Sequence, residues 1–208
     1  MATILKALTS EEITVLDTHD AVDPAVKTVK AQYSRPWINH GSIGPSCAVA
    51  LFKDGEMTIW THSQGTFDVQ RVAADLLDLP PEKVHAIHVE GSGCYGQNGA
   101  DDVAAEVAVI AKAVPGKPIR LQWMREQEFG REPLGCAMAT ELRASLDANN
   151  RIIDWHHEVW SNPHNTRPVD GGGVLVGSEV VPSFPAHAVK PIPMPEGDGD
   201  RVTTSAAA

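Results

Sequence analysis

A glycine-rich stretch near the middle of the chain combines residue types that suit the binding of an anionic group. An apolar run at Val84–Val89 leads into it, and a helical pattern begins just after it, at Ala100. Backbone N–H groups in a glycine loop can approach a ligand closely, and a helix start adds partial positive charge. We therefore expect a nucleotide-like or pterin-like anion to bind there. The loop consists of Gly91, Ser92, Gly93, Cys94, Tyr95 and Gly96.

The same loop fits the pattern G-x-G-x-x-G, which is typical of dinucleotide-binding domains. In those domains the helix follows at once and a parallel βαβ unit continues. Here Gln97-Asn98-Gly99 intervenes, and long antiparallel strands are expected further on. A nicotinamide-binding Rossmann domain and a tight glycine turn without any ligand are thus the two alternatives to an anion site.

Gln64 is the second candidate, because it stands where a strand passes into a helix. The preceding strand ends in the polar residues Thr61-His62-Ser63. A side-chain amide at such a corner can both donate and accept hydrogen bonds. The alternative, a polar turn that only caps the next helix, is the one that the residues alone favour.

Apolar patterning predicts an α+β fold with mixed sheets, helices and antiparallel hairpins. Asp54-Gly55 joins two β-like runs, 47–52 and 57–62, and is a strong hairpin signal. A longer hairpin is expected from Met138–Asp147 and Arg151–Trp160. The remaining expected elements are a strand at Thr28–Tyr33, a helix that ends at Pro80-Pro81, a helix at Asp101–Val114, a strand at Ile119–Met124 and an exposed charged turn at Arg125–Glu128.

Composition divides the chain into three segments. Residues 1–30 are expected to be a lead-in with a short helix, because Thr9 and Glu12 have capping-box spacing. Residues 31–160 hold the α+β domain. Residues 161–208 contain seven of the fifteen prolines and show no periodicity, so we expect an extended Pro/Gly-rich arm along a partner or another domain, with a frayed end at 202–208. A disordered tail is the alternative for this segment.

The charge balance argues against nucleic acid as a partner. The chain has 17 Lys and Arg against 27 Asp and Glu, a net charge of −10, and no basic cluster. No apolar run is long enough for a signal peptide or a membrane span. We expect a cytoplasmic protein without a membrane span, and export in a complex with a signal-bearing partner stays open.

Cysteines and histidines do not form a recognisable metal motif. Cys47, Cys94 and Cys136 lie too far apart for a CxxC site, and an odd number does not suggest a disulfide framework. His85 and His88 are three apart on an expected strand, and therefore point to opposite faces of it. We expect reduced thiols and no metal ligated directly by side chains.

Five stretches together resemble the molybdenum-cofactor-binding subunit of the xanthine dehydrogenase and aldehyde oxidase family. Their order and spacing match over roughly Asp17 to Asp200, and the isoquinoline 1-oxidoreductase and nicotinate dehydrogenase branch is resembled most. Jointly the stretches are specific, although each alone is not. They are Tyr33–Ala50, Trp60–Asp68, Leu77–Glu90, Gly91–Asp102 and Gly116–Arg125.

The resemblance implies roles for both candidate sites. Gln64 matches the family's glutamine that hydrogen-bonds an oxygen ligand of molybdenum, and Gly91–Gly96 matches the G-G-G-F-G-G loop whose backbone meets the metal centre and the pterin. Cys94 stands at the family's phenylalanine and Tyr95 at a following glycine, which suits the isoquinoline-type branch. The stacking contact with an aromatic substrate is thereby left open, while the backbone N–H of Tyr95 could still serve.

The resemblance also implies a cofactor, a reaction and partners. The cofactor is molybdopterin cytosine dinucleotide carrying molybdenum, and the reaction is oxidation of an N-heterocycle or aldehyde with water as oxygen donor. The partners are the remainder of the molybdenum subunit, a 2Fe-2S subunit that carries the iron–sulfur clusters, a flavin or cytochrome subunit as a further option, and the small-molecule substrate.

No catalytic residue is assigned in this chain. The family's glutamate base sits in a G-x-G-E context that is absent here, and Glu179 and Glu196 are poor candidates for that role. We expect one portion of a molybdenum subunit that is inactive alone. A non-catalytic relict or assembly subunit is the alternative from a different functional class.

Overall fold

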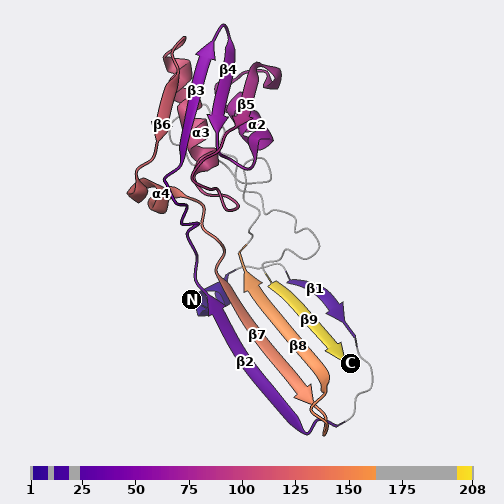
Figure 1. Cartoon of the computed structure of the whole chain (residues 1–208). Helices are drawn as coiled ribbons and strands as arrows, with labels where there is room; N and C mark the ends of the chain where they lie inside the picture. Colours follow the sequence, from indigo (N-terminus) through magenta and orange to yellow (C-terminus); the bar gives the residue numbers. More distant parts are fainter. Residues whose placement is uncertain (1, 9–11, 19–23, 163–200, 208) are drawn as a thin grey trace. The chain divides into compact units, whose positions relative to one another are not determined.

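The computed structural model describes residues 2–8, 12–18, 24–162 and 201–207 (Figure 1). Residue contacts group these into two compact units: residues up to 38 and from 135 onward form the first, and residues 39–134 form the second. The predicted α+β class is confirmed, with mixed and antiparallel sheets and several helices. The three-segment division at residues 30 and 160 is one of composition and stays a prediction.

The second unit is a four-stranded sheet in the order β5-β4-β3-β6. The predicted hairpin of β3 and β4 is confirmed, and its turn residues Asp54 and Gly55 have φ angles of 52° and 81°. Positive φ at both positions is what a tight two-residue hairpin turn requires. The elements of this unit are β3 (Cys47–Lys53), β4 (Glu56–Thr61), α2 (Thr66–Leu77), η1 (Pro81–Lys83), β5 (Val84–His88), α3 (Ala100–Ala113), β6 (Ile119–Gln122) and α4 (Arg125–Arg131).

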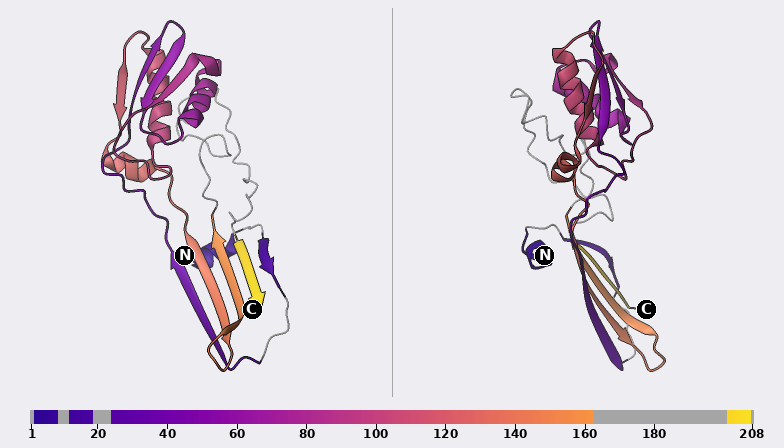
Figure 2. Two further views of the ribbon diagram at one scale, coloured as in Figure 1. Left: turned by 45° about the vertical axis from the view of Figure 1, so that its right-hand side comes forward. Right: turned by 60° about the vertical axis from the view of Figure 1, so that its left-hand side comes forward.

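Helices α2 and α3 pack on one face of this sheet (Figure 2). Alternate residues of β3 and β4 face them, among them Ala50 and Ile59, each with no exposed surface. Val103 and Val107 of α3 are also fully buried, as the helical spacing predicts, whereas Ile110 farther along the helix is 40% exposed. Small alanines on α3 and β3 let the helix lie close to the sheet in the main core of the unit.

The pairing of β4 with β5 positions both predicted sites. These strands are parallel neighbours, and Thr61 at the end of β4 pairs with His88 at the end of β5. The carboxyl ends of parallel neighbours meet at the same edge of a sheet. The segment that carries Gln64 and the glycine loop therefore leave the sheet side by side.

The predicted charged turn at Arg125–Glu128 is wrong. These residues begin helix α4, and Glu128 has no exposed surface at all. A run of charges usually marks a solvated surface, but this carboxylate finds three donors inside the unit and is buried with them. No local pattern reports such partners, because they come from distant parts of the chain.

The first unit is a five-stranded sheet in the order β1-β9-β8-β7-β2, with α1 on one face (Figure 2). The predicted long hairpin is confirmed as β7 and β8, with Asn150 at a φ of 61° in its turn. Leu5 of α1 is buried against Ala137, Ala139 and Trp160. The elements are α1 (Ala2–Ala7), β1 (Glu12–Asp17), β2 (Lys27–Arg35), β7 (Met138–Leu146), β8 (Ile152–Ser161) and β9 (Arg201–Ala207).

Two predictions at the chain ends are corrected. The N-terminal helix spans Ala2–Ala7, before the capping-box residues, and Glu12 begins strand β1 instead of a helix. At the other end, Arg201–Ala207 is not frayed but forms β9 between β1 and β8. Both corrections have one cause, because pairing and packing with distant strands outweigh weak local signals. The rest of the predicted arm, residues 163–200, lies outside the described residues.

Candidate functional site

The structure brings the two predicted sites into direct contact. Oε1 of Gln64 accepts a hydrogen bond of 2.8 Å from the backbone N–H of Gly96. Gln64 lies between β4 and α2 and is exposed, so its amide is available at the surface beside the loop. The helix-capping alternative does not hold, since no side chain caps the start of α2. Residues 32 positions apart in sequence thus form one site.

The glycines of the loop are required by its geometry. Gly93 and Gly96 have φ angles of 102° and 109°, a region that side chains strongly disfavour. Gly91 has an ordinary backbone, but a Cβ there would lie 2.4 Å from the Cβ of His62. The loop therefore turns tightly and packs directly on the end of β4.

A neighbouring segment, residues 40–46, which we call the support segment, holds the loop by hydrogen bonds from backbone and side-chain groups. The N–H of Ile43 donates to the carbonyl of Ser92 over 3.2 Å, and the Ser92 hydroxyl donates to the carbonyl of Gly44 over 2.8 Å. At the far end of the loop, Gln97 N–H donates to Nε2 of His40 over 3.4 Å. The side chain of Ser92 is thus turned toward this segment and helps to hold the loop against it.

Helix α4 holds this segment in place through two charged side chains. The buried carboxylate of Glu128 accepts from the N–H and the hydroxyl of Ser46 over 2.8 and 3.0 Å, and from the N–H of Gly99 over 3.4 Å. One turn earlier, Arg125 donates to the carbonyls of Ser42 and Ile43, each over 2.8 Å. Glu128 therefore ties the start of α3, the support segment and α4 to one point.

The end of the glycine loop is fixed by a buried amide. Asn98 has no exposed surface; its Nδ2 donates to the carbonyl of Gly93 over 2.9 Å, and its Oδ1 accepts from Ala100 N–H over 3.0 Å. The first contact closes the loop on itself, and the second satisfies an N–H in the first turn of α3. The loop conformation is thus set before any ligand binds.

Burial lowers the pKa of His62 below its ordinary value of 6.5, although the carboxylates of Glu128 and Asp101 act in the opposite direction. His62 is 6% exposed, and its Nε2 accepts from the N–H of Cys47 over 3.4 Å. A proton on Nε2 would face that N–H group. His62 is therefore held as the neutral imidazole beneath the glycine loop.

The side chains of the loop differ in direction. Cys94 is 4% exposed, and its thiol donates to the carbonyl of Gly96 at 3.6 Å. Tyr95 is 54% exposed. The accessible groups of the site are thus the Gln64 amide, the loop backbone and the Tyr95 ring. Amide and backbone N–H donors suit phosphate oxygens and other oxygen atoms that carry negative charge.

Side-chain metal ligands do not gather in the part of the chain that the structure describes: no three His, Cys, Asp or Glu side chains there could hold an ion together. Among the same residues, no helix is long and apolar enough to cross a membrane. The three cysteines are free.

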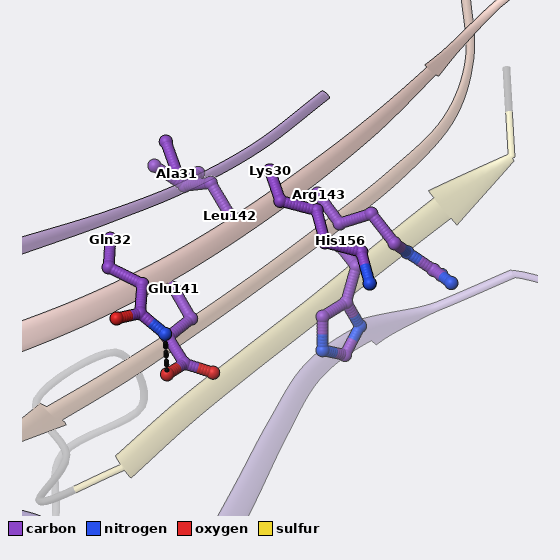
Figure 3. Close-up of a pocket in the computed structure, with 7 residues that line it drawn as sticks. All are labelled: Lys30, Ala31, Gln32, Glu141, Leu142, Arg143 and His156. Carbon is purple, nitrogen blue, oxygen red and sulfur yellow. Dashed lines mark hydrogen bonds between the residues drawn. The ribbon is translucent and has the colours of Figure 1, made fainter. Parts of the chain in front are cut away.

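A shallow pocket lies elsewhere, on the sheet of the first unit (Figure 3). Lys30, Arg143 and His156 point into it from three neighbouring strands, together with Glu141, which accepts from Gln32 over 2.7 Å. Arg143 is also paired with Asp154 at 3.2 Å. The charges largely compensate one another, and none of the predicted site residues lines this pocket.

A family model described as "Molybdopterin cofactor-binding domain" matches residues 6–174. The chain belongs to this family. The match covers both units and includes Gln64 and the whole glycine loop. The expected resemblance is therefore confirmed, and no comparison supports a nicotinamide-binding domain.

Two relatives of the chain are named as subunits of a dehydrogenase and of an oxidoreductase. It is 34% identical over 194 residues to a nicotinate dehydrogenase subunit of Pseudomonas putida, covering 91% of this chain and 15% of that protein. It is 27% identical over 115 residues to the beta subunit of isoquinoline 1-oxidoreductase of Brevundimonas diminuta, covering 55% of this chain and 15% of the relative. The chain thus spans only a small part of the length of these relatives.

Solved structures share the fold. The aldehyde oxidoreductase of Desulfovibrio gigas superposes with a TM-score of 0.53 at 21% identity, over 62% of this chain and 14% of the other. Quinoline 2-oxidoreductase of Pseudomonas putida gives a TM-score of 0.53 at 18% identity, over 62% of this chain and 17% of the other. At these identities the likeness establishes the fold alone.

Sequence reasoning misses the residues that support the loop. Local pattern places Arg125 and Glu128 in an exposed turn, and it gives no reason to single out His40 or Asn98. One signal in the sequence could have found them. Arg125 and Glu128 are three residues apart, so they would lie on the same face if this stretch is assumed to be a helix. Nothing local indicates that this face is buried.

We expect Glu128→Gln to loosen the glycine loop. The amide keeps the size of the carboxylate but replaces one acceptor with a donor, which would face the N–H or hydroxyl of Ser46. The free energy of unfolding of the second unit should fall by about 1–3 kcal/mol. Hydrogen exchange should quicken at the amides of residues 91–99. The exposed Glu126→Gln on the same helix is the control, and equal exchange in both variants would contradict the role of Glu128.

We expect the stability of the second unit to fall as pH drops below 6.5. Folding lowers the pKa of His62 below its ordinary value of 6.5. At pH values between these two pKa values, the unfolded chain therefore binds more protons than the folded chain. The stabilisation that neutral His62 contributes is thus complete only above pH 6.5. Urea unfolding at pH 7.5 and at pH 5.5, monitored by hydrogen exchange at the backbone amides of β3 and β4, measures the change in the free energy of unfolding. His62→Gln should reduce the pH dependence, whereas the exposed His85→Gln should keep it. An unchanged slope in His62→Gln would refute the assignment.

Proposed function

We propose that this chain is the cofactor-binding portion of a molybdenum hydroxylase that oxidises an N-heterocycle or an aldehyde with water as oxygen donor. The hydrogen bond between Gln64 and Gly96 carries the proposal, because it joins the two family-matched elements in one surface site. The names of the relatives, which act on nicotinate and isoquinoline, support this substrate class.

The chain's own residues would bind and orient the cofactor. Gln64 has its carbonyl oxygen fixed by Gly96, so its NH₂ group points away and can donate to an oxygen on the metal. Backbone N–H groups of residues 91–95 would contact the pterin side, since the N–H of Gly96 donates to Gln64. When bound, the molybdenum cofactor supplies the redox chemistry and accepts the electrons of the oxidation. The protein's share is a preformed surface that holds this group in one orientation.

The chemical form of the cofactor and the kinds of partner subunit belong to the same proposal. We assign molybdopterin cytosine dinucleotide as the form bound, with iron–sulfur clusters on a 2Fe-2S partner subunit and a flavin or cytochrome subunit as a further option. Three relatives are named as subunits, one of them of a dehydrogenase complex, which supports assembly with other chains. Free cysteines suit a cytoplasmic setting.

Activity is expected only in the assembled enzyme. The chain spans 15% of the length of two relatives, and its sequence holds no G-x-G-E motif for the catalytic base. The remainder of the molybdenum subunit would supply that base and close the site over the substrate. Gln64 and the loop are therefore binding and orienting elements.

The molybdenum content of the native complex tests the proposal directly. The complex recovered from the host with a tagged form of this chain should contain one molybdenum per copy of the chain, together with a longer chain and an iron–sulfur subunit. Elemental analysis and subunit masses measure this. Recovery of the chain alone and free of metal would instead favour a non-catalytic relict.

Gln64→Ala is expected to lower turnover of the assembled enzyme by about 10²-fold, the size typical of losing one oriented donor at a reacting centre. Molybdenum content and subunit composition should stay the same, because Gln64 is exposed and the loop is held independently by Asn98 and Ser92. The exposed Gln122→Ala on β6 is the matched control. Turnover equal to that of the control would count against Gln64 as a molybdenum contact.

A further inference from the structure

The backbone of Tyr95 is unusual for its residue type. Four residues other than glycine have positive φ in the described ranges, and three of them are Asp54, Asp78 and Asn150, whose short polar side chains tolerate this region. Tyr95, at a φ of 52°, is the only bulky one among them. A strained conformation of this kind persists only where the surrounding structure enforces it, and such residues concentrate at functional sites.

The hydroxyl end of the Tyr95 side chain occupies space that a glycine leaves open. A Cβ at Gly93 would lie 2.5 Å from Cζ and 2.7 Å from Oη of Tyr95, so the ring rests against the Gly93 backbone. The side chain is nevertheless 54% exposed. The loop backbone therefore supports the hydroxyl end of the ring, while about half of the residue's surface stays accessible.

Position 94 cannot present a side chain to the same side. Cys94 is 4% exposed and its thiol is turned toward the carbonyl of Gly96. The next residue after Tyr95, Gly96, donates its N–H to Gln64. The phenol ring is thus the one large side chain that the loop offers to the surface beside the Gln64 amide.

We propose that Tyr95 is a specificity-determining residue whose exposed ring contacts a flat heteroaromatic substrate. The inference rests on the proposed function, because it places the substrate beside Gln64. An electron-rich phenol ring stacks well on an electron-poor heteroaromatic ring, and a ring held against the backbone loses little freedom on binding. A small aliphatic aldehyde offers no ring to stack. The strained backbone at position 95 thereby selects heterocycles over small aldehydes.

The test uses the complex recovered with the tagged full chain, carrying Tyr95→Asn or Tyr95→Phe. Asparagine removes the ring and tolerates positive φ, so it keeps the loop conformation. Tyr33→Asn alters the only other tyrosine, which is 63% exposed on β2 in the first unit, and is the control. The dissociation constant of isoquinoline is measured by equilibrium dialysis in the dithionite-reduced complex, which cannot oxidise it. KM and kcat are measured for isoquinoline, nicotinate and acetaldehyde.

Tyr95→Asn should weaken isoquinoline binding about five- to tenfold and raise KM for both heterocycles to the same degree. The ratio of kcat/KM for isoquinoline to kcat/KM for acetaldehyde should therefore fall about five- to tenfold, because a lost stacking contact affects only substrates that have a ring. The molybdenum content should stay within about twofold of the parent complex. Tyr95→Phe keeps the ring and should keep this ratio, whereas Tyr33→Asn, outside the site, should behave as the parent. Equal losses for acetaldehyde and isoquinoline would show a merely structural role and overturn the proposal.

The outcomes separate this inference from the proposed function. A molybdenum-containing, active complex whose isoquinoline binding is unchanged in Tyr95→Asn overturns the role of Tyr95 and keeps the hydroxylase. A complex without molybdenum that binds isoquinoline in a Tyr95-dependent way keeps the contact and removes the hydroxylase. Failure of the parent complex to bind isoquinoline overturns the contact as well.

Discussion

The buried carboxylate of Glu128 is the interaction on which the site depends. A charge without exposed surface is stable only when donors surround it, and Glu128 takes its donors from Ser46 and Gly99. Those donors belong to the support segment and to the residue before α3. Removal of this one acceptor would leave three buried donors without their partner, so the anchor is needed by three elements at once. The glycine loop is held rigid because both the support segment and the start of α3 are fixed by Glu128.

The parallel register of β4 and β5 determines where the site lies. Because the ends of these strands pair at Thr61 and His88, the residues that follow each strand emerge together. Gln64 then needs to reach only across to Gly96 to accept its N–H. A shift of the register by one residue would turn the strand side chains to the opposite face and expose the core residues Met57 and Ile59. The core and the site are therefore specified by the same pairing.

Rigidity and strain have separate roles in this loop. Glycines at 93 and 96 adopt positive φ at little cost, and Asn98 and Ser92 fix the result by hydrogen bonds. Tyr95 adopts the same region against its preference, and its ring occupies the space that Gly93 leaves free. An exposed aromatic side chain held on a rigid loop is prepared for contact with a ligand before the ligand arrives. The backbone that we propose to contact the pterin and the exposed Tyr95 ring thus lie next to each other in one short stretch of sequence.

The sequence alone determined the features that local pattern controls. The Asp54-Gly55 hairpin, the helix at α3, the long β7–β8 hairpin and the glycine loop each follow from periodicity or turn chemistry within a few residues. The family resemblance rested on the same local motifs, and it was confirmed. Only the tertiary structure decided that Gln64 accepts from Gly96, that Glu128 is buried instead of solvated, and that Arg201–Ala207 pairs as a strand. Each of these depends on partners that lie far away in sequence, where burial and strand pairing outweigh local preference and leave no periodic signal.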